Sequence, residues 1–315
     1  MAALPSLRQL QYLVAIAEHL NFTRAAEACF VTQSTLSAGL KELETVLGAQ
    51  VVERDRRTVV LTPLGREIAA RAKSLLAEAE DLVNLAAGAG EPMSGTLRLG
   101  VIPTIAPFLL PKALPALRER YPKLRLALRE DLTGNLLTRL RDGELDLVLS
   151  ALPYDTGELL VRPLFDDEFW LAGPQGDPVL KAKHPPITGA VAERLLLLEE
   201  GHCLRDHTLA VCNRGERTSA SRLEATSLLT LLQMVESGLG LALVPELALR
   251  SGVLSNTSLI ARPLAPPAPR RTIALVARHT TGRSAELDAL AEFLVDLRKR
   301  EGRAVLTSRG RLNRG

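Results

Sequence analysis

The chain has 315 residues, enough for two or three domains, and its formal net charge of +3 says little about its partners. No apolar run reaches the ~18 residues that a bilayer span needs, so a membrane protein is excluded, and we expect no secretory signal. Three cysteines in so long a chain do not form a disulfide framework. We therefore expect a cytoplasmic protein. In that reducing compartment a disulfide acts as a redox signal rather than as a structural crosslink.

Three helical patterns occupy the N-terminal segment. Helices are expected over residues 7–19, 24–29 and 33–47. Thr23 is the expected N-cap of the second helix and Thr32 that of the third, which Gly48 ends. A short turn followed by a helix is the arrangement of a helix-turn-helix. Cys29 lies among small apolar positions of the second helix and is expected in its core.

Polar residues gather at the start of the third expected helix. A helix-turn-helix places such a helix in the major groove, where glutamine reads adenine and hydroxyls bind phosphates or bases. The expected DNA contacts of this helix are Gln33, Ser34, Thr35, Ser37 and Lys41.

A basic tip between two short apolar strands follows and predicts a winged hairpin. Arg54, Arg56 and Arg57 are expected to bind phosphates beside the recognition helix. Thr62, also counted among the DNA contacts, caps a long helix that has Pro63 at its first position. Acidic and basic residues nearly balance in number over residues 1–66. The prediction of DNA binding therefore rests on how the residues are arranged and not on net charge. The alternative for each arginine is a solvated surface charge.

The long helix carries one continuous apolar stripe over residues 64–86. A helix of this length needs a partner for such a stripe. The partner is either the same helix of a second subunit or another part of this chain. Residues 88–92 read as a hinge.

The C-terminal portion alternates between apolar strands and amphipathic helices, which predicts a mostly parallel sheet with covering helices. Residues 169–172 cross into a second unit, and residues 273–276 return to the first. A helix over residues 285–300 follows, and the basic stretch 298–315 lacks periodicity and is expected to be a disordered tail.

Residues 199–212 contain two of the three cysteines. Cys203 has His202 beside it and Arg205 two residues on, and cationic neighbours lower the pKa of a thiol. Cys212 is placed to act as a resolving thiol. In a helix, nine residues rise ~13 Å, whereas a disulfide tolerates a Cα separation of about 4.4–6.8 Å. A bond between the two would force the segment to bend or unwind, which suggests a redox switch.

Two alternatives stay open for this segment. Free cysteines are often buried and inert, so both thiols can belong to a core. His202, Cys203, His207 and Cys212 also offer four zinc-type ligands, although their spacing matches no compact finger.

The chain resembles the LysR-type transcriptional regulators over nearly its whole length. The motifs that carry the resemblance are Leu7-Arg8-Gln9-Leu10-Gln11-Tyr12, Asn21-Phe22-Thr23-Arg24-Ala25-Ala26-Glu27, Thr32-Gln33-Ser34-Thr35-Leu36-Ser37, Leu43-Glu44 and Leu61-Thr62-Pro63-Leu64-Gly65. One departure is Ala38-Gly39, where many members have a basic residue after the serine.

The resemblance implies an α/β protein with three parts and a tail. These are a winged helix-turn-helix over residues 1–65, a linker and dimerisation helix with a hinge over 66–92, a periplasmic-binding-protein-like effector domain over 93–302, and a basic tail over 303–315. The effector domain comprises two α/β subdomains, one of residues 93–166 and 271–302, the other of residues 167–270. The resemblance further implies promoter DNA and RNA polymerase as partners, a homodimer through the linker helix, and a tetramer.

Within that family, Gly201-His202-Cys203-Leu204-Arg205-Asp206 followed by Cys212 resembles the redox segment of the OxyR-type peroxide sensors. The similarity implies that Cys203 reacts with hydrogen peroxide, that Cys212 resolves the product as a Cys203–Cys212 disulfide, and that a cellular thiol reductant resets it. Peroxide-binding positions implied by the similarity are Thr104, Thr133, His202, Cys203 and Arg270. No cofactor or metal is implied, and residues 252–260 depart from the pattern.

Three other functions remain as alternatives. A related regulator could bind a small metabolite between its subdomains and carry idle cysteines. A thiol peroxidase would use the same thiols, but a turnover enzyme needs no helix-turn-helix. A metal-responsive regulator is the last alternative.

Overall fold

The computed structural model describes residues 3–54, 59–88, 92–211 and 224–312. It divides into two compact units, one made mainly of the first 89 residues and one of most of the remainder, and each is described by itself. None of the helices in these ranges is long and apolar enough to cross a membrane. The combination of an N-terminal helical unit and a mixed α/β unit is the predicted fold class.

Three short helices form the N-terminal unit: α1 (Leu7–His19), α2 (Phe22–Ala28) and α3 (Gln33–Leu47). The helix α3 has the predicted bounds, and Thr32 Oγ1 caps it by accepting the Thr35 amide at 3.2 Å. The predicted cap of α2 was wrong. Asn21 caps that helix, because its side-chain oxygen accepts the amides of Thr23 and Arg24 at 2.9 and 3.0 Å.

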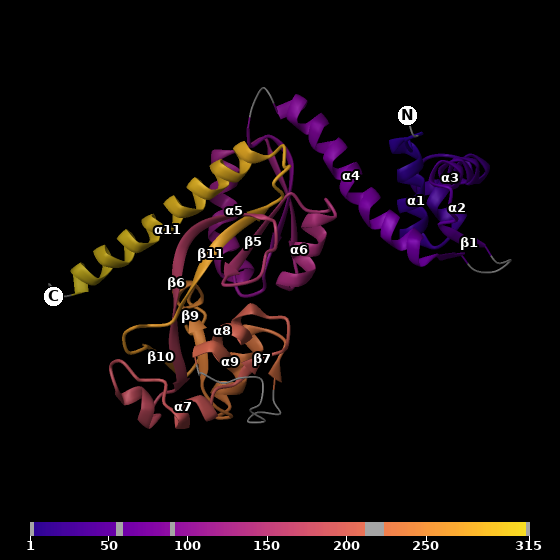
Figure 1. Ribbon diagram of the computed structural model, residues 1–315. Coiled ribbons are helices and arrows are strands. Elements are labelled where there is room, and N and C mark those ends of the chain that lie inside the picture. The colour runs from indigo at the N-terminus through magenta and orange to yellow at the C-terminus, as the bar shows by residue number, and fades with distance from the viewer. Residues whose placement is uncertain (1–2, 55–58, 89–91, 212–223, 313–315) are drawn as a thin grey trace. The chain divides into compact units, whose positions relative to one another are not determined.

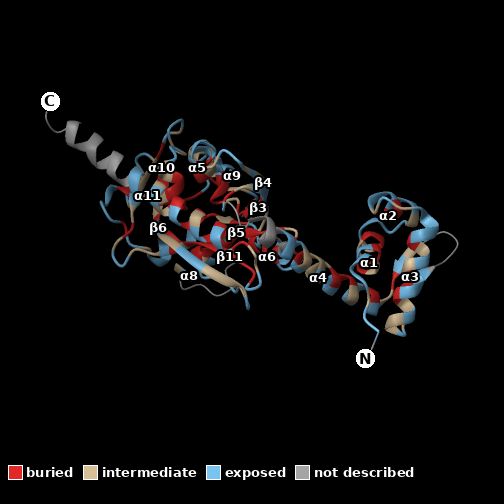
Figure 2. Cartoon of the chain, turned by 90° about the horizontal axis from the view of Figure 1, so that it is seen from above, coloured by how far each residue is buried: buried red, intermediate tan, exposed pale blue. Residues whose placement is uncertain are grey.

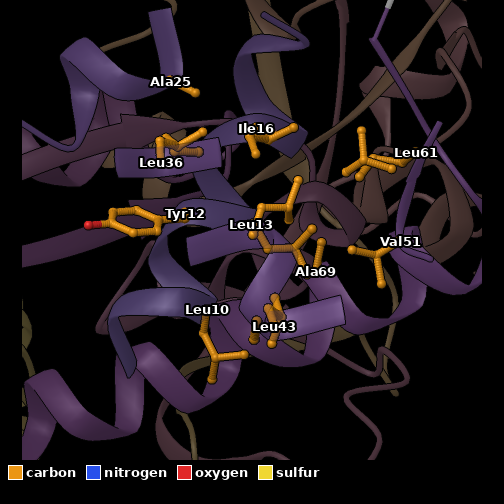
Figure 3. Close-up of a cluster of buried hydrophobic side chains, with 14 of the residues drawn as sticks. Leu10, Tyr12, Leu13, Ile16, Ala25, Leu36, Leu43, Val51, Leu61 and Ala69 are labelled. Carbon is orange, nitrogen blue, oxygen red and sulfur yellow. The ribbon is translucent and has the colours of Figure 1, made fainter. Parts of the chain in front are cut away.

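Apolar side chains from these helices meet in one core (Figure 3). Leu13 and Ile16 of α1 and Leu36 and Leu43 of α3 are fully buried in it. The hairpin of β1 (Val52–Arg54) and β2 (Val59–Leu61) is antiparallel, and the first turns of α4 (Pro63–Gly88) close the core through Ala69. This is the predicted winged helix-turn-helix followed by a long helix.

The second unit is built on a mixed sheet of strand order β10-β6-β11-β5-β3-β4, with β9 also paired to β6. Its strands are β3 (Gly95–Val101), β4 (Leu124–Glu130), β5 (Leu147–Leu152), β6 (Leu160–Pro174), β9 (Ala242–Pro245), β10 (Leu259–Pro263) and β11 (Arg270–Ala277). The strands β3, β4 and β5 are parallel, and the connecting helices are α5 (Ala106–Arg120) and α6 (Thr133–Arg141). Buried residues concentrate on β5 and β11 (Figure 2).

Two long strands join the halves of this unit (Figure 1). β11 pairs antiparallel with β5 on one side and with β6 on the other, so residues 273–276 return to the first subdomain as predicted. The far end of β6 pairs with β9 and β10 of the second subdomain. The sheet is therefore continuous across the two crossover strands.

The second subdomain adds a small parallel pair and several short helices. The pair is β7 (Leu197–Leu198) with β8 (Glu224–Ala225). The helices are η1 (Pro178–Lys181), α7 (Gly189–Glu193), α8 (Cys203–Val211), α9 (Leu228–Glu236) and α10 (Glu246–Arg250). The cysteine segment thus includes a helix that begins at Cys203.

The last helix is longer than predicted. α11 runs from Ser284 to Leu312, where the sequence predicted a helix ending at residue 300 and a disordered tail. Arginine, alanine and leucine are strong helix formers and outnumber the glycines of residues 301–312, so the helix continues without the apolar periodicity on which the prediction relied.

We predict that Gly65→Ala destabilises the N-terminal unit by about 1–3 kcal/mol, the usual cost of overpacking. A Cβ at this position would lie 1.9 Å from the Val51 carbonyl oxygen, and backbone cannot move aside cheaply. Hydrogen exchange of the helices α1 to α3 in the full chain measures the effect. Glu67→Ala, an exposed change on the same helix, is the control and is expected to stay within about 0.5 kcal/mol. Equal protection in the two variants would contradict this packing.

Candidate functional site

The polar residues at the start of α3 form one exposed face. Gln33, Ser34, Thr35 and Lys41 are exposed, and Ser37 is half-buried. Hydroxyl groups meet at the helix start, where Thr32 Oγ1 lies 2.9 Å from Ser34 Oγ and 2.8 Å from Thr35 Oγ1. Donors and acceptors at an exposed helix N-terminus suit contacts with phosphates and base edges.

Thr62 has a structural partner in this unit. Its Oγ1 accepts the Gly65 amide at 2.9 Å and donates to the Gln50 carbonyl at 3.1 Å, so it caps α4. The side chain of Arg54 and all of Arg56 and Arg57 lie outside the described residues, and so does Cys212. Predictions on those four residues stay predictions.

Cys203 is the first residue of α8, and 2% of it is exposed. The hydroxyls of Thr104 and Thr133 lie near its sulfur, where they favour the thiolate. Thr133 Oγ1 is buried without a hydrogen-bond partner among the described residues. Thr104 lies in the turn between β3 and α5, and Thr133 is the first residue of α6. Both threonines are 1% exposed. Turns that end parallel strands therefore bring residues from three distant parts of the sequence into one buried cluster of side chains around the thiol, the Cys203 pocket.

The arginine at this pocket is Arg271, not the predicted Arg270. Arg271 is 1% exposed, and its Nη1 donates to Thr104 Oγ1 at 2.7 Å. Arg270 has a side chain that is 63% exposed and pairs with Asp166 at 3.3 Å. Successive residues of a strand point to opposite faces, so a shift of one residue exchanges a buried position for an exposed one.

The predicted electrostatics of Cys203 also need correction. Burial raises the pKa of the Cys203 thiol, and this outweighs the opposing effects of Arg271 and the two threonine hydroxyls. Arg205, the expected local cation, donates instead to the Leu198 carbonyl at 2.8 Å and pairs with Glu224 at 2.6 Å. The resting cysteine is therefore a protonated thiol near neutral pH.

Two histidines flank the thiol along the chain. His202 is 7% exposed, and burial lowers its pKa despite a hydrogen bond to the backbone of Thr226. It stays neutral at pH 7, so it is not the cationic neighbour that the sequence suggested.

His207 is a pocket residue that the sequence prediction missed, although its spacing of four from Cys203 puts both on one face of a helix. His207 is 6% exposed, and its ring lies 5.9 Å from that of Phe169. Its Nε2 is 3.3 Å from the Pro153 carbonyl, which can only accept, so Nε2 carries the proton. Its Nδ1 is buried without a hydrogen-bond partner among the described residues.

No group of three or more His, Cys, Asp or Glu side chains suited to a metal ion occurs in the described part of the chain. Cys29 is half-buried beside α2, where its sulfur lies 4.0 Å from the Gln11 carbonyl. It packs against the helical core from its edge, where the sequence predicted a position inside the core.

Two family models match the chain. Residues 7–66 match the bacterial regulatory helix-turn-helix protein of the lysR family, and residues 90–299 match the LysR substrate binding domain. The chain belongs to the LysR family of bacterial regulators.

Similar regulators and structures cover almost the whole chain. The transcriptional regulator EstR of Acinetobacter baylyi is 47% identical over 93% of this chain and 97% of its own length. The dual regulator OxyR of Escherichia coli is 39% identical over 92% and 94%. A full-length OxyR variant from Pseudomonas aeruginosa superposes with a TM-score of 0.77 at 35% identity, covering 93% of this chain and 98% of the other. A Corynebacterium glutamicum OxyR variant in its H2O2-bound form matches with a TM-score of 0.64 at 35% identity, over 98% and 97%.

We predict that His207 makes the LysR-type effector domain acid-sensitive. Burial and the nearby charge of Arg271 lower the pKa of His207 from 6.5 to about 4. As the pH falls from 6.5 to about 4, the unfolded chain binds a proton that the folded chain does not, so folding loses about 3 kcal/mol across that window. Urea denaturation between pH 7 and 4.5 measures this loss. His207→Gln should remove this part of the slope, and an unchanged slope would contradict the assignment.

Proposed function

We propose that this LysR-type regulator senses hydrogen peroxide through Cys203. The observation that carries the proposal is the buried Cys203 thiol beside the hydroxyls of Thr104 and Thr133, with Arg271 donating a hydrogen bond to Thr104. The names of several relatives support it, since proteins of Mycobacterium avium and Streptomyces viridosporus at 41–42% identity are named "probable hydrogen peroxide-inducible genes activator". The similar Corynebacterium glutamicum structure is an OxyR with a substituted cysteine and bound H2O2.

The pocket offers the groups that peroxide reduction requires. The sulfur of Cys203 attacks one peroxide oxygen, so that an S–O bond forms while the O–O bond breaks. The departing oxygen leaves as hydroxide and takes the proton of the thiol, which gives a sulfenic acid and one water. Hydroxyl donors at Thr104 and Thr133 orient the peroxide and meet the developing negative charge. His202 is proposed to line the pocket as a neutral imidazole.

Burial supports selectivity for a small oxidant. A cysteine that is 2% exposed admits a molecule of two oxygen atoms more readily than a bulky one. Its raised pKa keeps the resting thiol protonated and slow toward adventitious electrophiles. The reaction therefore depends on hydrogen bonds that form only when a peroxide occupies the pocket.

Cys212 completes the proposed switch as the resolving thiol. Its sulfur condenses with the sulfenic acid of Cys203, releasing a second water and forming a disulfide. A disulfide between these residues is incompatible with a straight helix through the segment, and α8 begins at Cys203. Closing the ten-residue ring restricts the chain by about 2.7 kcal/mol, comparable with allosteric coupling energies.

Assembly and DNA binding follow the family pattern in this proposal. The helix α4 leaves Leu75, Leu82 and Val83 50%, 68% and 69% exposed, which supports a second subunit as their partner. The proposed species is a cytoplasmic homodimer, paired into a tetramer, that binds promoter DNA and acts with RNA polymerase. A cellular thiol reductant resets the disulfide, so peroxide is consumed stoichiometrically and not by turnover.

A second candidate function is a LysR-type regulator that binds a small metabolite. The observation that favours it is the deep burial of the Cys203 thiol. EstR, which is 47% identical, is named as a transcriptional regulator without reference to peroxide. In that case Cys203 is an idle core residue. The consumption of two thiols per chain by stoichiometric peroxide separates the two functions.

We predict that Cys203→Ser abolishes the response to peroxide, because serine cannot form a sulfenic acid. Footprinting of promoter DNA with oxidised and reduced protein measures the response. Cys29→Ser is the matched control and should respond as the natural protein does. A Cys203→Ser protein whose footprint still changes with peroxide would exclude this thiol as the sensor.

We predict that alanine at Arg54, Arg56 and Arg57 weakens binding to every DNA sequence. Each phosphate contact that is lost should reduce the slope of log K against log salt by about 0.9. Gln33→Ala is the control, because loss of a base contact lowers specificity and leaves the slope in place. An unchanged slope in the triple variant would remove the wing from the phosphate contacts.

A further inference from the structure

Asp167 is a buried carboxylate behind the Cys203 pocket that the peroxide chemistry above does not use. Its side chain and that of Arg271 are both 0% exposed. Oδ2 of Asp167 lies 3.0 Å from Nη2 and 3.1 Å from Nε of Arg271, and Oδ1 accepts the Leu247 amide at 2.8 Å. Because both oxygens have partners on different elements, the carboxylate is fixed in orientation.

The hydrogen bonds of Arg271 fix the direction of the Thr104 hydroxyl in turn. Nη1 donates to Thr104 Oγ1 at 2.7 Å, and Nη2 donates to the Thr104 carbonyl at 3.0 Å. A guanidinium has no acceptor, so Oγ1 receives this bond and its own proton points elsewhere. The Thr104 hydroxyl lies beside the Cys203 thiol, so its proton is left to donate toward that sulfur or toward a molecule bound there.

We propose that Asp167 is a positioning residue of the Cys203 site, which orients Arg271 so that Thr104 faces the pocket as a hydrogen-bond donor. The inference rests on the proposed peroxide-sensing function. A donor whose direction is set before the reaction stabilises the departing hydroxide without reorganisation. Asp167 acts through Arg271 and Thr104 and is not itself a reacting group.

Asp167 has a second effect, on charge. A lone buried cation favours the thiolate of a nearby cysteine, and a paired one does so less. Replacing Asp167 by asparagine should therefore make Cys203 more acidic while it leaves Thr104 without a set direction. The more acidic thiol speeds every reaction of the thiolate. The loss of a fixed direction for Thr104 slows only the reaction with peroxide.

The experiment uses the full-length chain with Cys29→Ser and Cys212→Ser, so that Cys203 is the single thiol. Its rates with hydrogen peroxide and with iodoacetamide are measured as a function of pH. In Asp167→Asn we expect the ratio of the peroxide rate to the alkylation rate to fall about tenfold, the worth of one hydrogen bond to a charged group. The midpoint of the alkylation profile should move to lower pH.

Three matched variants accompany it. Asp166→Asn removes the neighbouring exposed carboxylate that pairs with Arg270, and its ratio should stay within about twofold of the parent. Asp167→Glu keeps the charge and should recover part of the ratio. Arg271→Lys keeps a cation but loses the planar guanidinium that reaches both Asp167 and Thr104. The ratio of the peroxide rate to the alkylation rate should therefore fall, while the midpoint of the alkylation profile stays unchanged. If Asp167→Asn does not fold, the ratio of the two rates in Arg271→Lys tests the inference in its place.

A folded Asp167→Asn protein with an unchanged ratio overturns the inference. Equal falls in both rates, or an equal loss in Asp166→Asn, indicate a merely structural role and overturn it as well. A parent protein that alkylates at Cys203 but does not react with peroxide overturns the proposed function and the inference together. A reactive parent with an unaffected ratio in Asp167→Asn and Arg271→Lys overturns the inference alone.

Discussion

The buried ion pair between Asp167 and Arg271 is the interaction on which the effector domain depends. It joins β6 to β11, the two strands that carry the sheet from one subdomain to the other. Removing one partner of such a pair costs about 3–5 kcal/mol, because the other charge is left buried and unpaired. Arg271 also holds the turn after β3, because it donates hydrogen bonds to the hydroxyl and the carbonyl of Thr104. Subdomain architecture and pocket geometry therefore rest on the same guanidinium.

Burial decides the chemistry that the Cys203 pocket can support. An exposed thiol with cationic neighbours would be reactive toward many electrophiles, whereas this one is buried and protonated at rest. The turn before α8 helps to enclose it, since Gly201 has a φ of +92° and a Cβ there would lie 2.9 Å from a methyl group of Leu132. Selectivity in such a site comes from hydrogen bonds to the bound molecule, and not from a thiol that is acidic beforehand.

Local patterns predicted most of the fold. The core of the helix-turn-helix follows from leucines at helical spacing, and the caps at Thr32 and Thr62 follow from hydroxyl residues directly before helices. The errors arose where two residues satisfied the same local rule. Asn21 and Thr23 are both good caps, and only the folded backbone shows which oxygen accepts the amides. The buried arginine of the pocket was not predictable for a similar reason, because Arg270 and Arg271 differ only in the face of the strand on which they lie. Cys203 was predicted from its neighbours and its spacing to Cys212, and Thr104 and Thr133 from the resemblance. The raised pKa of Cys203 was missed, since sequence shows neighbouring charges and not burial.

In the proposed mechanism, Cys203 reacts with peroxide because of the groups in its pocket, and not because of its accessibility. The most direct measurement is mass spectrometric mapping of sulfenic acid in the full-length protein after one equivalent of hydrogen peroxide. Cys203 is 2% exposed, and Cys29 is half-buried. We predict oxidation at Cys203 with Cys29 intact. Oxidation at Cys29 first, or at neither residue, would contradict the claim.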